Sequence, residues 1–161
     1  MPKFILTDKF VINSFGIKLF QIKCTKSFKY AQKGDFGGYV EKEGNLDQEN
    51  DAWVSGDARV FGNAWVSDNA RVSGDAWVSG DADIENDNEH CGFDGFGSCN
   101  RHTHAYMTKE KKVEIICGCF RGSIEEFEKK VEETHSGTVY EKQYKSIINV
   151  IKIKFGLTDF T

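Results

Sequence analysis

Six consecutive six-residue repeats occupy the centre of the sequence and restrict its fold more than any other feature. From residue 51 the chain reads DAWVSG, DARVFG, NAWVSD, NARVSG, DAWVSG and DADIEN, with no insertion between units. Alanine stands second in every unit, valine or isoleucine stands fourth, and aspartate or asparagine stands first. A fixed period of this kind is typical of solenoid proteins, in which each repeat forms part of a stacked coil.

The residue types of the repeat predict how each unit folds. Alanine and the branched residue two positions later point to the same side of an extended segment, so both can fill an interior. Gly, Asp and Asn at the junctions accept turn conformations that other residues avoid. One unit then supplies one short strand and one corner, and three units close a triangular coil. The pattern resembles the hexapeptide-repeat left-handed β-helix family, whose members often associate as trimers.

A degenerate stretch precedes the perfect units and lengthens the expected coil. It runs from Gly37-Gly38-Tyr39-Val40 to Asn45-Leu46, and we expect Val40 and Leu46 at the alanine position. The resulting short left-handed parallel β-helix has about 2.5 coils at ~4.8 Å per level. Its open ends expose unpaired backbone and need to be covered.

The flanking segments are predicted to cover those ends, which makes the fold class mainly β with an α+β tail. Residues 1–35 should form an N-terminal β-hairpin around a turn at 13–16, and residues 36–88 the coil. Residues 89–161 should form a C-terminal ββαα module, with strands at 104–108 and 112–119. Its first helix should begin at Ser123, where Glu126 completes a capping box, and a second helix should span 140–155.

The third position of each unit points outward and alternates between tryptophan and arginine. A coil of three units places Trp53 beside Arg71, Arg59 beside Trp77, and Trp65 beside Asp83. Stacking of guanidinium on indole contributes about 0.5–1 kcal/mol at an exposed site, so a stabilising surface ladder is one interpretation. The other is a contact surface, because Trp and Arg are common interface anchors. The candidate binding residues are Trp53, Arg59, Trp65, Arg71, Trp77, Asp75, Asp81, Asp83 and Glu85.

The distribution of charge argues against nucleic-acid binding. The formal net charge is −4, but residues 51–88 carry eight acidic and two basic residues, a net of −6, between mildly basic ends. Five cysteines, an odd number, without a recognisable export signal favour reduced thiols and a cytoplasmic location. No stretch reaches the ~20 apolar residues of a membrane span.

Metal binding and catalysis have weak support in the sequence. Zinc candidates cluster after the repeats: Cys91, Cys99, His102, His104, Cys117 and Cys119. Structural zinc sites usually show two closely spaced ligand pairs, and these spacings differ, so we expect neither a metal nor another cofactor. Hexapeptide-repeat acyltransferases use a histidine as general base, yet all four histidines here lie beyond the repeats. We therefore expect no catalytic residues.

A second resemblance covers nearly the whole chain. The segments KGDFGGYVEKEGNL and CGCFRGSIEEFEKKVEETHSG, with the coil between them, resemble uncharacterised prophage-borne hexapeptide-repeat proteins, some described as polymer-forming. The resemblance implies an accessory protein of a phage or mobile element, for which countering host defence is an expected role.

These observations favour a non-catalytic binding protein that blocks a host protein sterically, as anti-CRISPR proteins do, for example a defence nuclease complex. Three alternatives stay open: an oligomeric sponge for a nucleotide signal, a hexapeptide-repeat acyltransferase, and a self-assembling scaffold. Membrane association and direct nucleic-acid binding are not expected, whereas a homodimer or homotrimer is possible. Arg101, Arg121, Lys129 and Lys130 could form a basic patch, although charged helix faces are usually only solvated.

Overall fold

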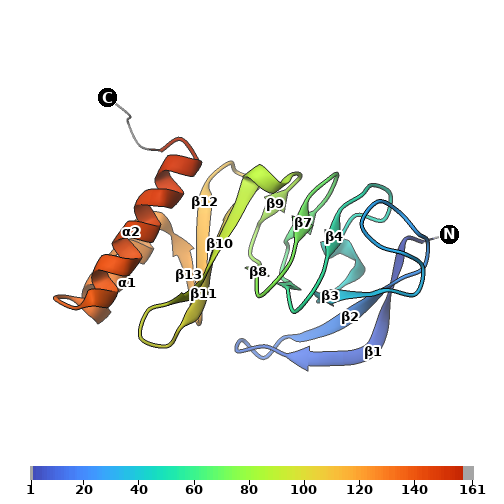
Figure 1. Cartoon of the computed structure of the whole chain (residues 1–161), viewed down its shortest axis with the longest axis horizontal. Helices are drawn as coiled ribbons and strands as arrows, with labels where there is room; N and C mark the ends of the chain where they lie inside the picture. Colours follow the sequence, from blue (N-terminus) through green and yellow to red (C-terminus); the bar gives the residue numbers. More distant parts are fainter. Residues whose placement is uncertain (1, 158–161) are drawn as a thin grey trace.

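The computed structural model describes residues 2–157 and arranges them as three parts in a row (Figure 1). A β-hairpin lies at the N-terminal end, a coil of very short strands occupies the middle, and an antiparallel sheet with two helices forms the other end. No helix among the described residues is long and apolar enough to cross a membrane.

Strands of two residues form three sides of the coil. Each strand pairs in parallel with the strand 18 residues later, as Val54 does with Val72. This interval equals three repeat units, so every level of the coil uses the same three sides. We call these side A (β4 Trp53–Val54 and β7 Arg71–Val72), side B (β5 Arg59–Val60 and β8 Trp77–Val78) and side C (β6 Trp65–Val66 and β9 Asp83–Ile84).

The interior of the coil is filled by the second and fourth residues of each unit. All twelve of these side chains are at most 1 % exposed: Ala52, Val54, Ala58, Val60, Ala64, Val66, Ala70, Val72, Ala76, Val78, Ala82 and Ile84. Burying one valine or isoleucine contributes roughly 1.5–3 kcal/mol. Because the same two residue types recur on each level, successive levels pack against each other in the same way.

The corners of the coil depend on one left-handed residue per unit. The last residue of five consecutive units has φ between 52° and 67°. Four of these residues are glycine, which adopts this conformation without strain. The fifth is Asp68, which adopts it despite its Cβ atom.

The first level of the coil corrects one sequence prediction. Val40 pairs with Val60 and Leu46 pairs with Val66, so both occupy the position of the branched residue and not that of alanine. Eight residues separate Leu46 from Val54, against six between equivalent residues elsewhere, which widens this corner. The buried Lys3 stabilises the wider corner, because its Nζ donates hydrogen bonds to the carbonyl oxygens of Asn50 and Ala52 at 2.6 Å each.

The expected hairpin is present and extends side B. Strands β1 (Phe4–Ile12) and β2 (Lys18–Cys24) pair in antiparallel fashion. Strand β2 pairs with β3 (Phe36–Val40), which pairs in turn with β5 of the coil, so the sheet order is β1-β2-β3-β5-β8. Side chains of the hairpin segment pack into the core of the coil and cover its first level: Phe4, Leu19 and Ile22.

The C-terminal part contains more strands than the sequence predicts. Its antiparallel sheet has four strands: β10 (His90–Phe96), β11 (Arg101–Met107), β12 (Val113–Cys117) and β13 (Phe120–Ser123). The expected strands correspond to β11 and β12, and the edge strands β10 and β13 were not predicted. Helix α1 (Ile124–His135) begins after Ser123 with the expected capping box, and α2 (Val139–Lys154) begins after Thr138. Two single-turn helices, η1 (Glu43–Asn45) and η2 (Asp87–Glu89), lie at corners of the coil.

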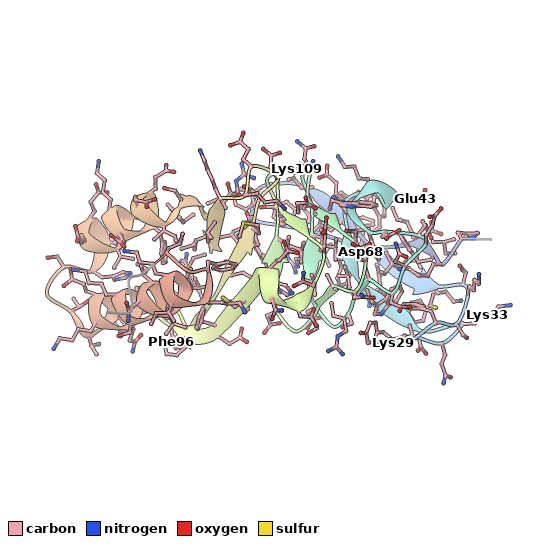
Figure 2. The ribbon with its side chains drawn as sticks, turned by 90° about the horizontal axis from the view of Figure 1, so that it is seen from above. Lys29, Lys33, Glu43, Asp68, Phe96 and Lys109 are labelled. Atoms are coloured by element: carbon pink, nitrogen blue, oxygen red, sulfur yellow. The ribbon has the colours of Figure 1, made fainter. Side chains whose placement is uncertain are left out.

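This sheet closes the second end of the coil with one face and holds the helices on the other. Tyr106 and Ile116 are buried in the core cluster of the coil, whereas Ala105 and Ile115 pack with the helices. The Lys109 backbone N–H donates to the Asp81 carbonyl at 3.0 Å, and Lys109 lies above the junction of sheet and coil in Figure 2. Both ends of the coil are therefore covered by other parts of the chain.

Candidate functional site

The outward tryptophans and arginines differ in how far they reach the surface. Trp53 is only 5 % exposed, because Phe28 packs edge-on against it with ring centroids 5.3 Å apart. Arg71 pairs with Trp53 in register, but its guanidinium lies over the ring of Tyr30, 4.6 Å from the centroid. The expected placement of Trp53 beside Arg71 is confirmed by the strand register. The expected exposure of Trp53 and its stacking with the Arg71 guanidinium are wrong, because the segment after the hairpin covers this tryptophan and Tyr30 contacts the arginine.

The stack predicted on side B is present. The Arg59 guanidinium lies 5.3 Å from the ring centroid of Trp77. Phe61 contacts the same tryptophan edge-on at 6.2 Å, and Phe15 from the hairpin turn packs on Phe61 at 6.0 Å. Trp77 is therefore held between a cation and an aromatic pair, which fixes the position of Arg59.

Side C carries most of the remaining candidate residues. Trp65 lies beside Asp83 as expected from the 18-residue interval. Asp81 and Glu85 are exposed near the same side, and Asp75 is exposed at the corner between sides A and B. Among these side-C and corner residues, Asp75 alone lines a groove at the junction of the coil and the C-terminal sheet.

Two open grooves lie where the coil meets the C-terminal sheet. The side-B groove has a volume of about 600 Å³ and is lined by Asp57, Arg59, Asp75 and Trp77 of the coil, and by Asp94 and His102 of the sheet, among others. The side-A groove has a volume of about 680 Å³ and is lined by Tyr30, Trp53, Arg71, Asp87 and His90, among others. The corners at residues 55–57 and 73–75 separate the two grooves along the chain.

A row of three histidines connects the two grooves beneath the sheet. His90 Nδ1 lies 2.8 Å from His104 Nε2, and His104 Nδ1 lies 2.9 Å from His102 Nε2. One end of the row is the Arg71 carbonyl oxygen, 3.0 Å from His90 Nε2. The other end is the Asp94 carboxylate, in contact with His102 Nδ1. The central residue, His104, is only 3 % exposed.

The partners at the two ends determine where the protons of the row reside. The Arg71 carbonyl can only accept, so His90 donates from Nε2 and accepts at Nδ1 from His104 Nε2. By the same logic His104 Nδ1 accepts from His102 Nε2, and His102 Nδ1 faces the Asp94 carboxylate. Desolvation lowers the pKa of His90, and lowers the pKa of His104 well below its usual value. Both are therefore neutral, as this arrangement requires.

The same arrangement leaves these histidines with no free ring nitrogen. A general base needs an unoccupied lone pair directed at its substrate, and every ring nitrogen of His90, His102 and His104 already has a hydrogen-bond partner. The row acts as a polar connection between the sheet and the coil.

The predicted zinc candidates do not converge. His102 and His104 belong to the row, Cys91 and Cys117 pack with the helices, and Cys99 and Cys119 are exposed. Within residues 2–157, no group of three or more His, Cys, Asp or Glu side chains is arranged to hold a metal ion.

His90, Asp94 and Asp57 line the grooves, although the sequence did not predict them as groove residues. His90 and Asp94 alternate along β10 as His102 and His104 do along β11, so the pattern His90-x-Gly92-x-Asp94 was the available signal. Glycines at 92, 95 and 97 obscure this strand in the sequence.

The fold and these surfaces define the chain as a β-solenoid protein whose coil is closed at both ends. Residues 52–68 and 64–80 match a family model described as the YdcK β-solenoid repeat. The two matches overlap and together span residues 52–80, so the similarity concerns the coil alone. No curated protein matches this chain.

Proposed function

We propose that this is a non-catalytic binding protein of a phage or other mobile element, which acts in the cytoplasm of a bacterial host. It blocks a host protein sterically, and a component of a host-defence system, as in anti-CRISPR activity, is the expected target. We further propose that the coil is a left-handed hexapeptide β-helix of about 2.5 turns. The six-residue units and the 18-residue pairing interval support this assignment.

The observation that carries the proposal is the pair of positioned arginines on neighbouring sides of the coil. Arg71 lies over Tyr30 and contacts Asp87 at 3.5 Å, and Arg59 lies over Trp77. Arginine loses much rotamer entropy when it is fixed at an interface. Both side chains are already positioned by an aromatic ring, so binding through them costs less. Together with the two grooves they form what we call the corner surface: Asp57, Arg59, Arg71, Asp75 and Trp77.

Charge supports a protein with a basic or mixed surface as the partner. Asp57 and Asp75 are exposed one level apart at the same corner, and Asp81 and Glu85 are exposed farther along the coil. Complementary charge raises association rates and selects among partners. An acidic coil surface of this kind could also imitate a nucleic-acid backbone toward a nuclease.

Three structural features weigh against the alternatives. The engaged ring nitrogens of the histidine row disfavour an acyltransferase. Arg59 already covers one face of Trp77, which a nucleotide base would need for stacking. The hairpin and the C-terminal sheet cover the two ends of the coil, which disfavours a scaffold that grows end to end.

An affinity capture from host lysate tests the proposal. The tagged wild-type protein should retain one host protein in stoichiometric amount. The double variant Arg59→Glu, Arg71→Glu should no longer retain this host protein, because reversing both charges makes the corner surface entirely negative. The control variant Lys109→Glu, Lys129→Glu makes the same charge change at exposed sites outside the corner surface and should retain the partner.

Melting temperatures of all three proteins show whether the variants fold. Retention of the partner by a folded Arg59→Glu, Arg71→Glu protein would assign binding to another surface. Absence of any stoichiometric protein, with a nucleotide released on denaturation, would replace the proposal by the sponge.

A further inference from the structure

A third cleft lies on the C-terminal part, away from the repeats. It has a volume of about 520 Å³ and lies between the loop at 97–101, the turn at 118–119 and helix α1. Its rim contains Arg101, Arg121 and Lys130, and its floor contains Phe120, Phe127 and Tyr144. We call it the tail cleft.

The charge of the tail cleft is positive and largely uncompensated. No carboxylate of the described part of the chain lines it. Arg121 Nε lies 3.9 Å from Glu114 Oε1 and is the only one of the three cations with an ion pair among the described residues. Unpaired cations above an apolar floor attract an anion more strongly than they would in open solvent.

The Arg101 side chain lies across the turn at Gly118, at the edge of the cleft. Gly118 has φ of +59°, and a Cβ atom at this position would collide with the Arg101 guanidinium. Only a residue without a side chain therefore allows the arginine to lie across this turn. Within residues 2–157 its one side-chain hydrogen-bond partner is the Cys99 thiol, which accepts from Nη2 at 3.8 Å. Most of the five guanidinium N–H donors are left for a ligand.

The aromatic floor and the adjacent loop are held by several contacts. Phe127 lies between Phe120, at 5.2 Å, and Tyr144, at 5.5 Å edge-on, measured between ring centroids. The loop is anchored to α2, because the Gly97 N–H donates to Gln143 Oε1 at 2.9 Å. Figure 2 shows the neighbouring Phe96 beside the helices. A ligand therefore meets a cleft that is already formed.

We propose that the tail cleft binds a small aromatic anion, with its phosphate or carboxylate at Arg101 and Lys130 and its ring on the aromatic floor. The volume lies within the ~300–1,000 Å³ typical of small-molecule sites. Arginine pairs with two oxygens of such a group at once. Arg101 also lines the side-B groove, whereas Lys130 and the aromatic floor line the tail cleft and not that groove, so variants of Lys130 distinguish this site from the corner surface.

A titration monitored by amide NMR tests the site with phenyl phosphate as the probe. The amides of Ser98 and Cys119, which line the tail cleft and not the side-B groove, should shift in a saturable manner at millimolar concentrations. Inorganic phosphate, which cannot use the floor, should bind at least tenfold more weakly. Failure of phenyl phosphate to shift these amides at 10 mM, or equal affinity for inorganic phosphate, would overturn the proposal.

Two neighbouring lysines of α1 provide a matched pair of variants. Lys130 lines the cleft, whereas Lys129 is exposed and does not. Lys130→Gln should weaken phenyl phosphate binding several-fold, Arg101→Gln should weaken it at least tenfold, and Lys129→Gln should leave it unchanged. Equal affinity in the Lys130 and Lys129 variants would refute the site.

Alkylation of Cys99 gives a second readout. This exposed thiol lines the cleft, and hydrogen bonds from Ser98 and Arg101 lower its pKa, which favours the reactive thiolate. Saturating phenyl phosphate should slow its reaction with iodoacetamide several-fold, as measured by mass spectrometry. An unchanged rate would contradict occupancy of the cleft. Capture of the host protein by the Lys130→Gln variant should remain normal, so the two proposals can fail independently.

Discussion

The coil and the C-terminal sheet are both built from short strands, but they are held together differently. In the coil each strand pairs with one 18 residues away, and all levels repeat the same Ala and Val contacts. In the sheet each strand has its own partners, and its two faces pack against different cores. Local repetition therefore specifies the coil, whereas the sheet depends on contacts particular to each residue.

The largest effect is expected where the two regions meet. Tyr106 is fully buried against the end of the coil, and its hydroxyl donates to Glu114. Tyr106→Ala should lower the free energy of unfolding by about 3–5 kcal/mol, because it leaves a cavity under the sheet. Chemical denaturation measures this loss, and hydrogen exchange should show faster opening of the last level of the coil.

Tyr140→Ala is the control for this variant, because Tyr140 is only partly buried on α2. It should cost less than about 1 kcal/mol. Similar losses from the two substitutions would mean that the sheet does not stabilise the end of the coil.

Lowering the pH should reduce the free energy of unfolding through the histidine row. The pKa values of His90 and His104 are lowered in the folded protein, so the unfolded chain binds their protons more tightly. Their contribution to stability is complete above the usual histidine pKa of about 6.5 and is lost as the pH falls below it. The slope should approach about 1.4 kcal/mol per pH unit for each proton taken up. Denaturation midpoints between pH 7.5 and 5 measure it.

The double variant His90→Gln, His104→Gln removes both titrating groups. Its stability should depend less on pH over the same range, although it is lower at pH 7.5. The same slope in the variant and the wild type would show that other groups cause the acid sensitivity.

A smaller effect is expected at the start of the first helix. The Ser123 hydroxyl accepts a hydrogen bond from the Glu126 backbone N–H at 3.1 Å. In return, Glu126 Oε1 accepts one from the Ser123 backbone N–H at 3.0 Å. Ser123→Ala should cost about 1 kcal/mol of unfolding free energy, as loss of such a cap usually does. Ser136→Ala at the other end of α1 is the matched control, since the Ser136 side chain makes no hydrogen bond among the described residues. A loss no larger than the control would exclude a capping role for Ser123.

The smallest effect should be a gain in stability within the coil. Asp68 has φ of 52°, a conformation that the equivalent glycines adopt without strain. Asp68→Gly should therefore raise the free energy of unfolding by about 0.5–1 kcal/mol. Asp57→Gly, at a corner residue without positive φ, should lower it by a similar amount because of backbone entropy. A loss of stability in both variants would mean that the contacts of Asp68 outweigh its strain.

The success of sequence-based prediction followed the difference between the two regions. The period alone predicted the pairing of Arg59 with Trp77 and of Trp65 with Asp83. It failed where neighbouring segments fold over the coil, since nothing in the repeat indicates that Phe28 would cover Trp53 or that Tyr30 would take Arg71. The two edge strands of the sheet were missed because glycine weakens their alternation.

The candidate site shows the same limit. The sequence predicted Arg59, Asp75 and Trp77 as binding residues, and all three line the side-B groove. It did not predict the residues with which the C-terminal sheet completes that groove. Asp94 and His102 lie eight residues apart on neighbouring strands, and only the pairing of β10 with β11 brings their side chains together. Arg101 and Lys130 meet at the tail cleft across two further elements. Long-range packing of this kind leaves no periodic signal.

The equal length of the repeats has a consequence for insertions and deletions in the gene. A duplication of 18 residues adds one level of ~4.8 Å and returns the chain to the same side of the coil. A duplication of six residues adds only one of the three sides of a level. The C-terminal part would then attach at a different corner, and the two grooves would change their position on the coil. Length changes in multiples of 18 therefore preserve the relative orientation of hairpin and helices, and a designer could use them to set the spacing between the two ends.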